Sequence, residues 1–331
     1  MPSSKIDPAL SSSVVDNRVY RITAPLVDFS LKDGELLPGR IDLGCSAILA
    51  RLNAEESTRL KTSSIAESDH HLHGIDFRLE LLNVHPNEAF RQWQLLVHEF
   101  MLIMREPLSV LTVVLDRHDG GVWRRGGWMW VQQTIRWSHG FPAERLAVLR
   151  NLRIGMGPKP PAQVTRALDH YERSVDALWR GDFDSALVMG ALSLESLLGY
   201  GFTSEVSYRL SLRAATLVGS SNDVFEYMRK LYSLRSGVVH GGKSANFEQA
   251  TKMQQALMRL VPAVAALVHE IGTYEGAMQT LDEIAVDRSV PLPATIQEAG
   301  WWSYVPLVEC FQREMPELWT SWPDGEVVIV D

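Results

Sequence analysis

The feature that most constrains the fold is a stretch rich in proline and glycine near the middle of the chain. Residues 155–161 read Gly-Met-Gly-Pro-Lys-Pro-Pro, a composition that suits neither a helix interior nor a central strand. Before this stretch apolar residues alternate or form β-branched runs, whereas after it they recur every three or four positions, the helical period. The sequence therefore predicts an α+β protein, with a β-rich N-terminal domain at 1–154 and an all-α bundle at 155–271.

Three strands and a helix are predicted in the first part of the N-terminal domain. Apolar or β-branched runs at 19–31, 41–52 and 75–84 are separated by Gly, Pro, Asp and Asn, as is typical of strands joined by turns. At 86–106 the apolar residues change to helical spacing, with a proline in the first turn and another just past the end. We expect a mixed domain in which several antiparallel strands pack against this helix.

A β-hairpin is predicted around Asp119-Gly120, a dipeptide typical of tight turns, because strand-like runs flank it. In the second run, Trp123, Arg124 and Arg125 interleave aromatic and basic side chains. Tryptophan can stack on bases while arginine holds phosphates, so these residues are candidate RNA or ligand contacts. The same alternation also lets tryptophan face the core and arginine face water, which is the interpretation that a half-buried strand favours.

Four residues between the second and third predicted strands carry groups that bind metals. Asp69, His70, His71 and His73 lie close together in the sequence, but no helical or strand spacing fixes them relative to one another. A polar turn is the favoured interpretation. We therefore predict no metal site and no cofactor.

Five helices are predicted after the linker. Asp182 can cap the second, Gly219 can end the third, and Pro262 is expected to kink or break the fifth. In chain order the five predicted helices cover 164–178, 183–198, 204–218, 222–241 and 247–271.

Arg235 and His240 stand near the end of the fourth predicted helix. A guanidinium can hold a phosphate with a fork of donors, and an imidazole titrates near neutral pH, so the pair is a minimal set for phosphodiester chemistry without a metal. On a regular helix the two side chains diverge by about 140°. A common site thus needs either fraying at Gly237 or Gly241, or a second copy of the helix crossing the first. In the alternative, structural interpretation, His240 caps the carbonyls at the end of the helix and Arg235 is a solvated or salt-bridged surface residue.

Other charged residues of the bundle could assist this pair. Glu195 lies on an otherwise apolar helix face, where a carboxylate usually needs a cationic partner, and Arg209 or Arg213 is expected to form a structural pair with it. The functional alternative is that Glu195 orients the catalytic arginine. Lys243 adds positive charge near Arg235, which suits a phosphate site and is equally common on a solvated helix face.

The stretch Arg235-Ser-Gly-Val-Val-His240 resembles the signature of the HEPN domain family, an arginine followed four to six residues later by a histidine. The surrounding LYSLRSGVVHG is similar to the ApeA-like branch, as are LSLESLLG at 192–199 and EVSYRLSLRAATLVG at 205–219. The resemblance covers residues 160–271, about a third of the chain.

This resemblance implies a helical bundle that forms a homodimer and acts as a metal-independent endoribonuclease, with the active cleft between the two copies. Arg235 would stabilise the scissile phosphate and His240 would transfer a proton. Many catalytic members have asparagine, aspartate or histidine directly after the arginine, whereas Ser236 stands there in this chain. The branch implies a role in phage defence or toxin-like growth arrest, with RNA as the partner and tRNA as one candidate.

Two functions without catalysis remain open. Some HEPN domains are noncatalytic modules that bind nucleotides or proteins and dimerise, and the fold by itself does not decide the activity. An antitoxin or scaffold, in which Arg235 and His240 only stabilise a dimer, is the other.

Composition is that of an ordinary globular protein, with 46% hydrophobic and 22% charged residues. Two cysteines, no apolar leader and no long apolar run predict a cytoplasmic protein without disulfides or membrane contact. The net charge of −8 disfavours broad binding to nucleic acids, so an RNA site must be local.

The C-terminal extension at 272–331 carries several tryptophans and is expected to fold against the bundle or a partner copy.

Overall fold

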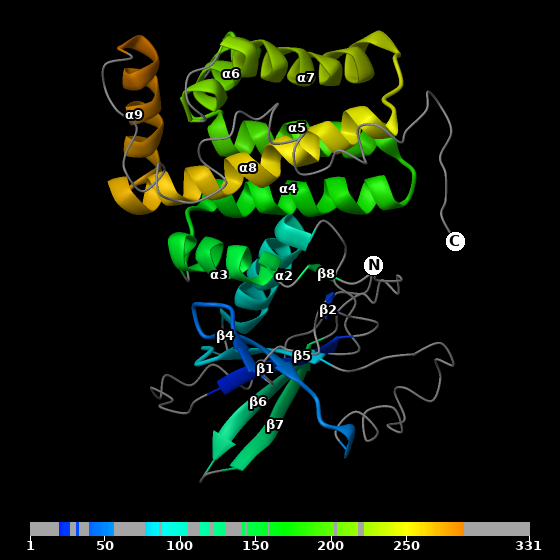
Figure 1. The fold of residues 1–331 in the computed structure, drawn as a ribbon, viewed down its shortest axis with the longest axis vertical. Helices are drawn as coiled ribbons and strands as arrows, with labels where there is room; N and C mark the ends of the chain where they lie inside the picture. Colours follow the sequence, from blue (N-terminus) through cyan, green and yellow to red (C-terminus); the bar gives the residue numbers. More distant parts are fainter. Residues whose placement is uncertain are drawn as a thin grey trace, which may run out of the picture.

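In the computed structural model, an antiparallel sheet is followed by a stack of helices (Figure 1). This agrees with the predicted order of a β-rich part before a helical bundle. The structure describes residues 20–26, 31–32, 40–55, 77–85, 88–104, 113–119, 122–129, 141–142, 144–157, 159–201, 204–217 and 222–287.

The sheet has six strands in the order β3-β4-β5-β1-β6-β7, and every neighbouring pair is antiparallel. Two further short strands, β2 (Leu31–Lys32) and β8 (Phe141–Pro142), form a separate parallel pair. The strands of the main sheet are β1 (Tyr20–Leu26), β3 (Arg40–Asp42), β4 (Ala47–Arg51), β5 (Phe77–Leu82), β6 (Val113–Asp119) and β7 (Val122–Met129). The predicted hairpin is confirmed, because β6 pairs with β7 and Asp119 lies opposite Val122.

The single strand predicted at 41–52 is wrong, because the chain reverses within it to form the hairpin β3–β4. Gly44, Cys45 and Ser46 all have positive φ angles, of 79°, 46° and 63°. The Asp42 carboxylate accepts a hydrogen bond of 2.9 Å from the backbone N–H of Gly44 and so supports the turn. The apolar residues on both sides of this turn gave the appearance of one continuous strand.

Two helices join the sheet to the bundle: α2 (Ala89–Met104) and α3 (Glu144–Met156) lie between the sheet and the larger helices (Figure 1). Glu99 and Arg153 form a buried ion pair between them. Arg153 also donates from Nε to the carbonyl of Gly44 at 3.3 Å, which ties the β3–β4 turn to both helices. Burial lowers the pKa of Arg153 to about 10, so the guanidinium stays charged at neutral pH.

Helix boundaries in the bundle follow local capping signals. The Asp182 side chain accepts a hydrogen bond from Ser185 N at 3.0 Å and begins α5, as predicted. Asn246 and Gln249 form a capping box at the start of α8. The bundle helices are α4 (Ala162–Trp179), α5 (Phe183–Leu198), α6 (Val206–Leu217), α7 (Asn222–Gly241), α8 (Phe247–Ile271) and α9 (Tyr274–Val286).

The break expected at Pro262 does not occur, because α8 continues through it. Proline removes one backbone hydrogen bond, but residues along most of α8 are buried, so packing on several sides holds the helix together.

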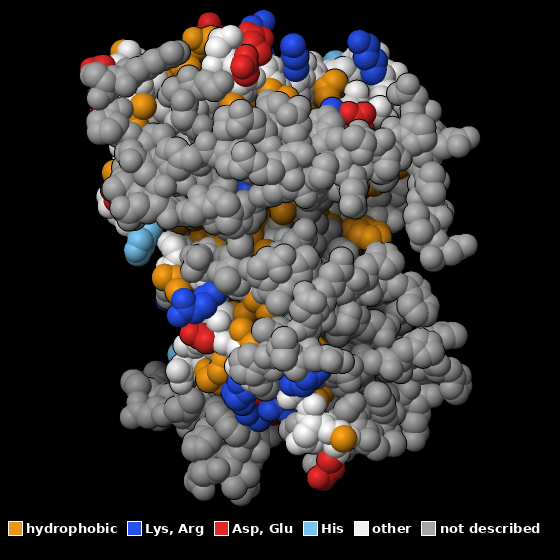
Figure 2. Space-filling model, in the orientation of Figure 1, with side chains coloured by type: hydrophobic (Ala, Val, Ile, Leu, Met, Phe, Trp, Pro, Cys, Tyr) orange, Lys and Arg blue, Asp and Glu red, His pale blue; other side chains and the backbone are white. Residues whose placement is uncertain are grey.

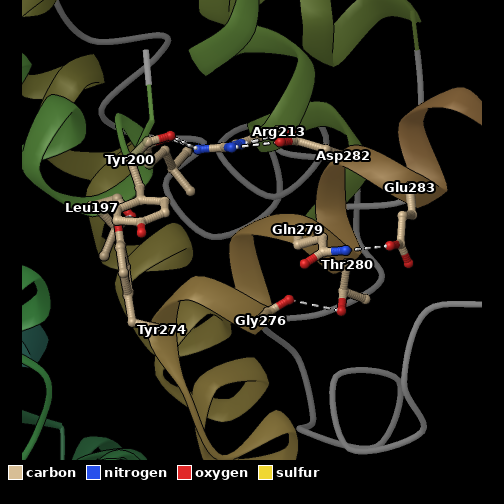
Figure 3. A network of polar contacts seen from close by, with 10 residues as sticks. Leu197, Tyr200, Arg213, Tyr274, Gly276, Gln279, Thr280, Asp282 and Glu283 are labelled. Atoms are coloured by element: carbon tan, nitrogen blue, oxygen red, sulfur yellow. Dashed lines mark hydrogen bonds and ion pairs between the residues drawn. The ribbon is translucent and has the colours of Figure 1, made fainter.

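Helix α9 belongs to the predicted C-terminal extension and packs on the bundle (Figure 3). Arg213 of α6 forms two hydrogen bonds to the Asp282 carboxylate, of 2.7 and 2.6 Å, and donates to the carbonyls of Leu198 and Tyr200. The Tyr274 hydroxyl donates to the carbonyl of Leu197 at 2.7 Å. The tryptophans predicted to fold against the bundle, Trp301, Trp302, Trp319 and Trp322, lie outside the described residues.

The sheet and the bundle share one contiguous cluster of buried apolar side chains, which runs from Ile22 on β1 to Leu281 on α9. A polar contact also crosses the junction, where both nitrogens of His98 on α2 face carboxylates of α4, Asp169 at 3.2 Å and Glu172 at 2.7 Å. Among the helices in the described ranges, none is long and apolar enough by itself to span a membrane. The α8–α9 pair reaches that length and hydropathy only in combination and is bent by 105°.

Candidate functional site

Helix α7, which carries Arg235 and His240, is regular from Asn222 to Gly241 and does not fray at Gly237. The two side chains therefore diverge by about 140° around the helix axis within one protomer. Fraying at Gly237, one of the two ways to a common site, does not occur. A crossing second copy of the helix stays a prediction, as does the alternative in which His240 caps the helix and Arg235 is a surface residue.

The two halves of α7 differ in burial. Val224, Met228, Leu231 and Tyr232 are buried against the bundle, but no residue from 233 to 241 is. Val239 in this second half is 48% exposed. Helices α6 and α7 lie on the side of the bundle away from the sheet (Figure 1), and Lys and Arg side chains are visible along that edge (Figure 2). Arg235 and His240 thus both belong to the less buried half of the helix, residues 233–241.

Arg235 is held by Glu195 of α5. Its Nη1 lies 3.4 Å from Oε1 of Glu195, and the two side chains are 28% and 27% exposed. Nε of Arg235 is buried and has no hydrogen-bond partner within the described ranges. The guanidinium is also 6.0 Å from the ring centre of Tyr232, one turn earlier on α7. Nη1 is the atom paired with the carboxylate, and the side chain is partly exposed, so the guanidinium still has donors that a phosphate could use.

Tyr232 contacts the same carboxylate oxygen as Arg235. Its hydroxyl donates to Oε1 of Glu195 at 2.6 Å. Burial raises the pKa of Tyr232 most, and the hydrogen bond and charge of Glu195 raise it further, so the phenol remains a donor at neutral pH. Tyr232 was not among the residues predicted from the sequence, although its position three residues before Arg235 places both on one helix face.

The prediction that Arg209 or Arg213 pairs with Glu195 is wrong. Arg213 is buried and is engaged by Asp282 of α9 (Figure 3), while Arg209 is an exposed residue of α6. Helical spacing indicated that Glu195 lies on an inward face, but it does not say which helix packs there. The neighbour at Glu195 is α7, so its partner is Arg235.

Ser236, His240 and Lys243 are all exposed. The chain turns back after α7, with Gly242 in the left-handed region at φ 59°, and the N–H of Lys243 donates to the carbonyl of Gly237 at 3.2 Å. Gly237 and His240 are three residues apart and share a helix side, so Lys243 lies on the side of His240.

Two other groups of candidate residues are not described in full. Trp123, Arg124 and Arg125 lie on β7, where the structure describes the backbone but not the side chains. The segment with Asp69, His70, His71 and His73 lies outside the described residues. In the ranges that are described, no group of three or more His, Cys, Asp or Glu side chains is arranged to hold a metal ion.

A scan against protein-family models, a search of curated proteins and a search of solved structures each find no match for this chain.

Proposed function

We propose that this protein is a metal-independent endoribonuclease of the HEPN type, acting as a homodimer through α7. The observation that carries the proposal is the arrangement on the less buried half of α7. There, a guanidinium paired with Glu195, whose carboxylate also accepts from Tyr232, and an exposed imidazole occur on one helix. The signature Arg235-Ser-Gly-Val-Val-His240 supports the same assignment.

Arg235 is suited to hold the phosphate at which the strand is cut. A guanidinium pre-positioned by a carboxylate loses little side-chain freedom when it binds, and its remaining donors can stabilise the charge that develops on the phosphoryl oxygens. In this reaction the ribose 2′-oxygen attacks phosphorus and the 5′-oxygen leaves. The products are a 2′,3′-cyclic phosphate and a 5′-hydroxyl end.

His240 is suited to proton transfer. One imidazole can take the proton from the 2′-hydroxyl, and another can give a proton to the leaving 5′-oxygen, so two copies of the chain supply both groups without a metal. Because Arg235 and His240 diverge within one protomer, a second α7 crossing the first would bring each histidine toward the partner arginine. Exposed Val239 and partly buried Val238 offer apolar surface for that crossing.

A noncatalytic, dimerising module that binds nucleotides or proteins is the second candidate. The presence of Ser236 directly after the arginine favours it, since many catalytic relatives have a different polar residue there. This module would bind RNA without cutting it. Phage defence or toxin-like growth arrest remains the proposed setting for the first candidate.

The deciding experiment incubates the wild-type protein and the His240→Ala variant with total RNA and with tRNA, and analyses the ends of the products. We expect 2′,3′-cyclic phosphate and 5′-hydroxyl ends with wild type and none with the variant, which should remain folded and dimeric in light scattering. His269→Ala is the matched control, because His269 is also an exposed histidine in the last turn of a helix. Absence of cleavage by wild type, or equal cleavage by His240→Ala, would contradict the proposal.

A further inference from the structure

A basic stripe on α4 lies apart from the residues that the signature contains. Arg166, His170 and Arg173 follow one another at spacings of four and three residues, which places them on the same side of the helix. The two arginines are exposed, and neither makes a hydrogen bond or an ion pair with any residue in the described ranges. Arg180, at the end of the same helix, does have an acidic partner, because its Nη2 lies 2.6 Å from Oδ2 of Asp176.

Helix packing brings this stripe to the Glu195–Arg235 pair. Ser193 of α5 donates to the carbonyl of Ala167 on α4 at 2.6 Å, and Ser174 of α4 donates to the carbonyl of Ala186 on α5 at 2.7 Å, so the two helices are antiparallel and in close contact. Glu195 follows Ser193 by two residues and therefore lies near the level of Arg166. Since Glu195 also contacts α7, it lies between the stripe and Arg235.

His170 is the central member of the stripe. Its Nδ1 is buried and has no hydrogen-bond partner in the described part of the chain, while the ring as a whole is only partly buried. Burial lowers the pKa of His170 most, and Arg173 and Arg166 lower it further against the opposing effect of Asp169 and Glu195. The ring is therefore neutral at neutral pH, and the positive charge of the stripe comes from its two arginines.

We propose that Arg166, His170 and Arg173 form a track that binds the backbone of single-stranded RNA and leads it to Arg235. This inference rests on the proposed function, of which it specifies the substrate path. The chain carries a net charge of −8, so an RNA strand needs a local group of cations. Two exposed arginines on one stripe, which form no ion pair with any residue in the described part of the chain, provide it. Seven residues span about 10 Å of helix, so the two arginines engage different phosphates. The neutral His170 hydrogen-bonds to the ribose between them.

The test measures the binding of a short fluorescein-labelled oligouridine by anisotropy over a range of salt concentrations, with all variants made in the full-length His240→Ala protein. Arg166→Ala/Arg173→Ala should weaken binding about tenfold and reduce the slope of log Kd against log salt by about 1.4, the value for two phosphate contacts on a single strand. Arg150→Ala/Arg180→Ala removes the same charge from two exposed arginines that already have carboxylate partners, and it should change neither quantity.

Equal effects of the two double variants, or no measurable binding by the His240→Ala protein, would overturn the track. His170→Phe should weaken binding without changing the salt slope, and unchanged affinity would remove His170 from the track. The result is separable from the nuclease assignment. Selective loss of binding in Arg166→Ala/Arg173→Ala would support the track even if wild type cuts no RNA, and cleavage with unchanged binding would retain the nuclease and reject the track.

Discussion

Glu195 on α5 lies 3.4 Å from the guanidinium of Arg235 on α7. The contact explains how a carboxylate is accommodated on an otherwise apolar helix face, since the arginine supplies its counter-charge and Tyr232 supplies a hydrogen bond. It also restrains the arginine of the signature before any substrate binds. In the proposed enzyme, Glu195 is therefore a positioning residue.

Glu195→Gln tests this positioning role. The amide has nearly the same shape and can still accept the Tyr232 hydrogen bond, but it no longer attracts Arg235 by charge. We expect kcat for RNA cleavage to fall about tenfold to a hundredfold with little change in KM, and the melting temperature to change little. A purely structural pair would instead lower the melting temperature and leave kcat of the folded protein unchanged.

Arg235→Lys tests whether the arginine acts through its fork of donors. Lysine keeps the charge but offers a single ammonium group, so affinity for RNA should be largely retained while the cleavage rate falls about a hundredfold. Arg229→Lys is the control on the same helix, because Arg229 is exposed and pairs with Glu226. Equal cleavage rates for the two variants would show that charge alone suffices at Arg235.

The helices of the bundle were predictable because their limits are set by neighbours in sequence. Asp182 accepts from Ser185, Asn246 forms a box with Gln249, and the spacing of buried residues indicates the inward face. These signals act within one turn. The turn at Gly44, Cys45 and Ser46 was not predicted. Of these three residue types only glycine commonly adopts a positive φ, and the residues on both sides are apolar, as in a continuous strand.

The partners of charged residues across helices were not predictable. Glu195 and Arg213 each needed a countercharge, but helical period gives the direction of a side chain and not the helix that it meets. The structure pairs Glu195 with α7 and Arg213 with α9, a helix within the extension whose fold the sequence left open. For the same reason the stripe on α4 could not be connected to Arg235 from spacing alone.

Metal removal tests the proposed chemistry directly. In the proposed enzyme, Arg235 supplies the positive charge at the phosphate and His240 carries the proton, so cleavage should continue in excess EDTA at an unchanged rate. The measurement compares initial rates with EDTA, with Mg²⁺, and with EDTA followed by Mg²⁺. A rate that disappears in EDTA and returns with Mg²⁺ would move the chemistry to carboxylates.

Arg213→Ala should destabilise the attachment of α9. Arg213 is buried and satisfies the carbonyls of Leu198 and Tyr200 as well as Asp282, so its removal leaves buried acceptors without a donor. We expect the free energy of unfolding to fall by about 3 kcal/mol. Asp282→Asn should cost less, about 1 kcal/mol, because Asp282 is half exposed and the carbonyl contacts remain. Urea unfolding of both variants checks the order, and a larger loss from Asp282→Asn would contradict it.

His170 should make stability depend on pH in a defined direction. Its pKa in the folded chain is lowered from the ordinary value of 6.5, with burial as the main cause. Between the two values the unfolded chain binds a proton that the folded chain does not, so protons favour unfolding in that window. The free energy of unfolding should therefore fall as the pH drops below about 6.5 and stop responding to this group once the folded pKa is passed.

His170→Gln tests this, because glutamine does not titrate. Urea unfolding measured across pH should show wild type losing more stability than the variant on acidification. Parallel curves for the two proteins would mean that His170 is as accessible to protons in the folded chain as in the unfolded one.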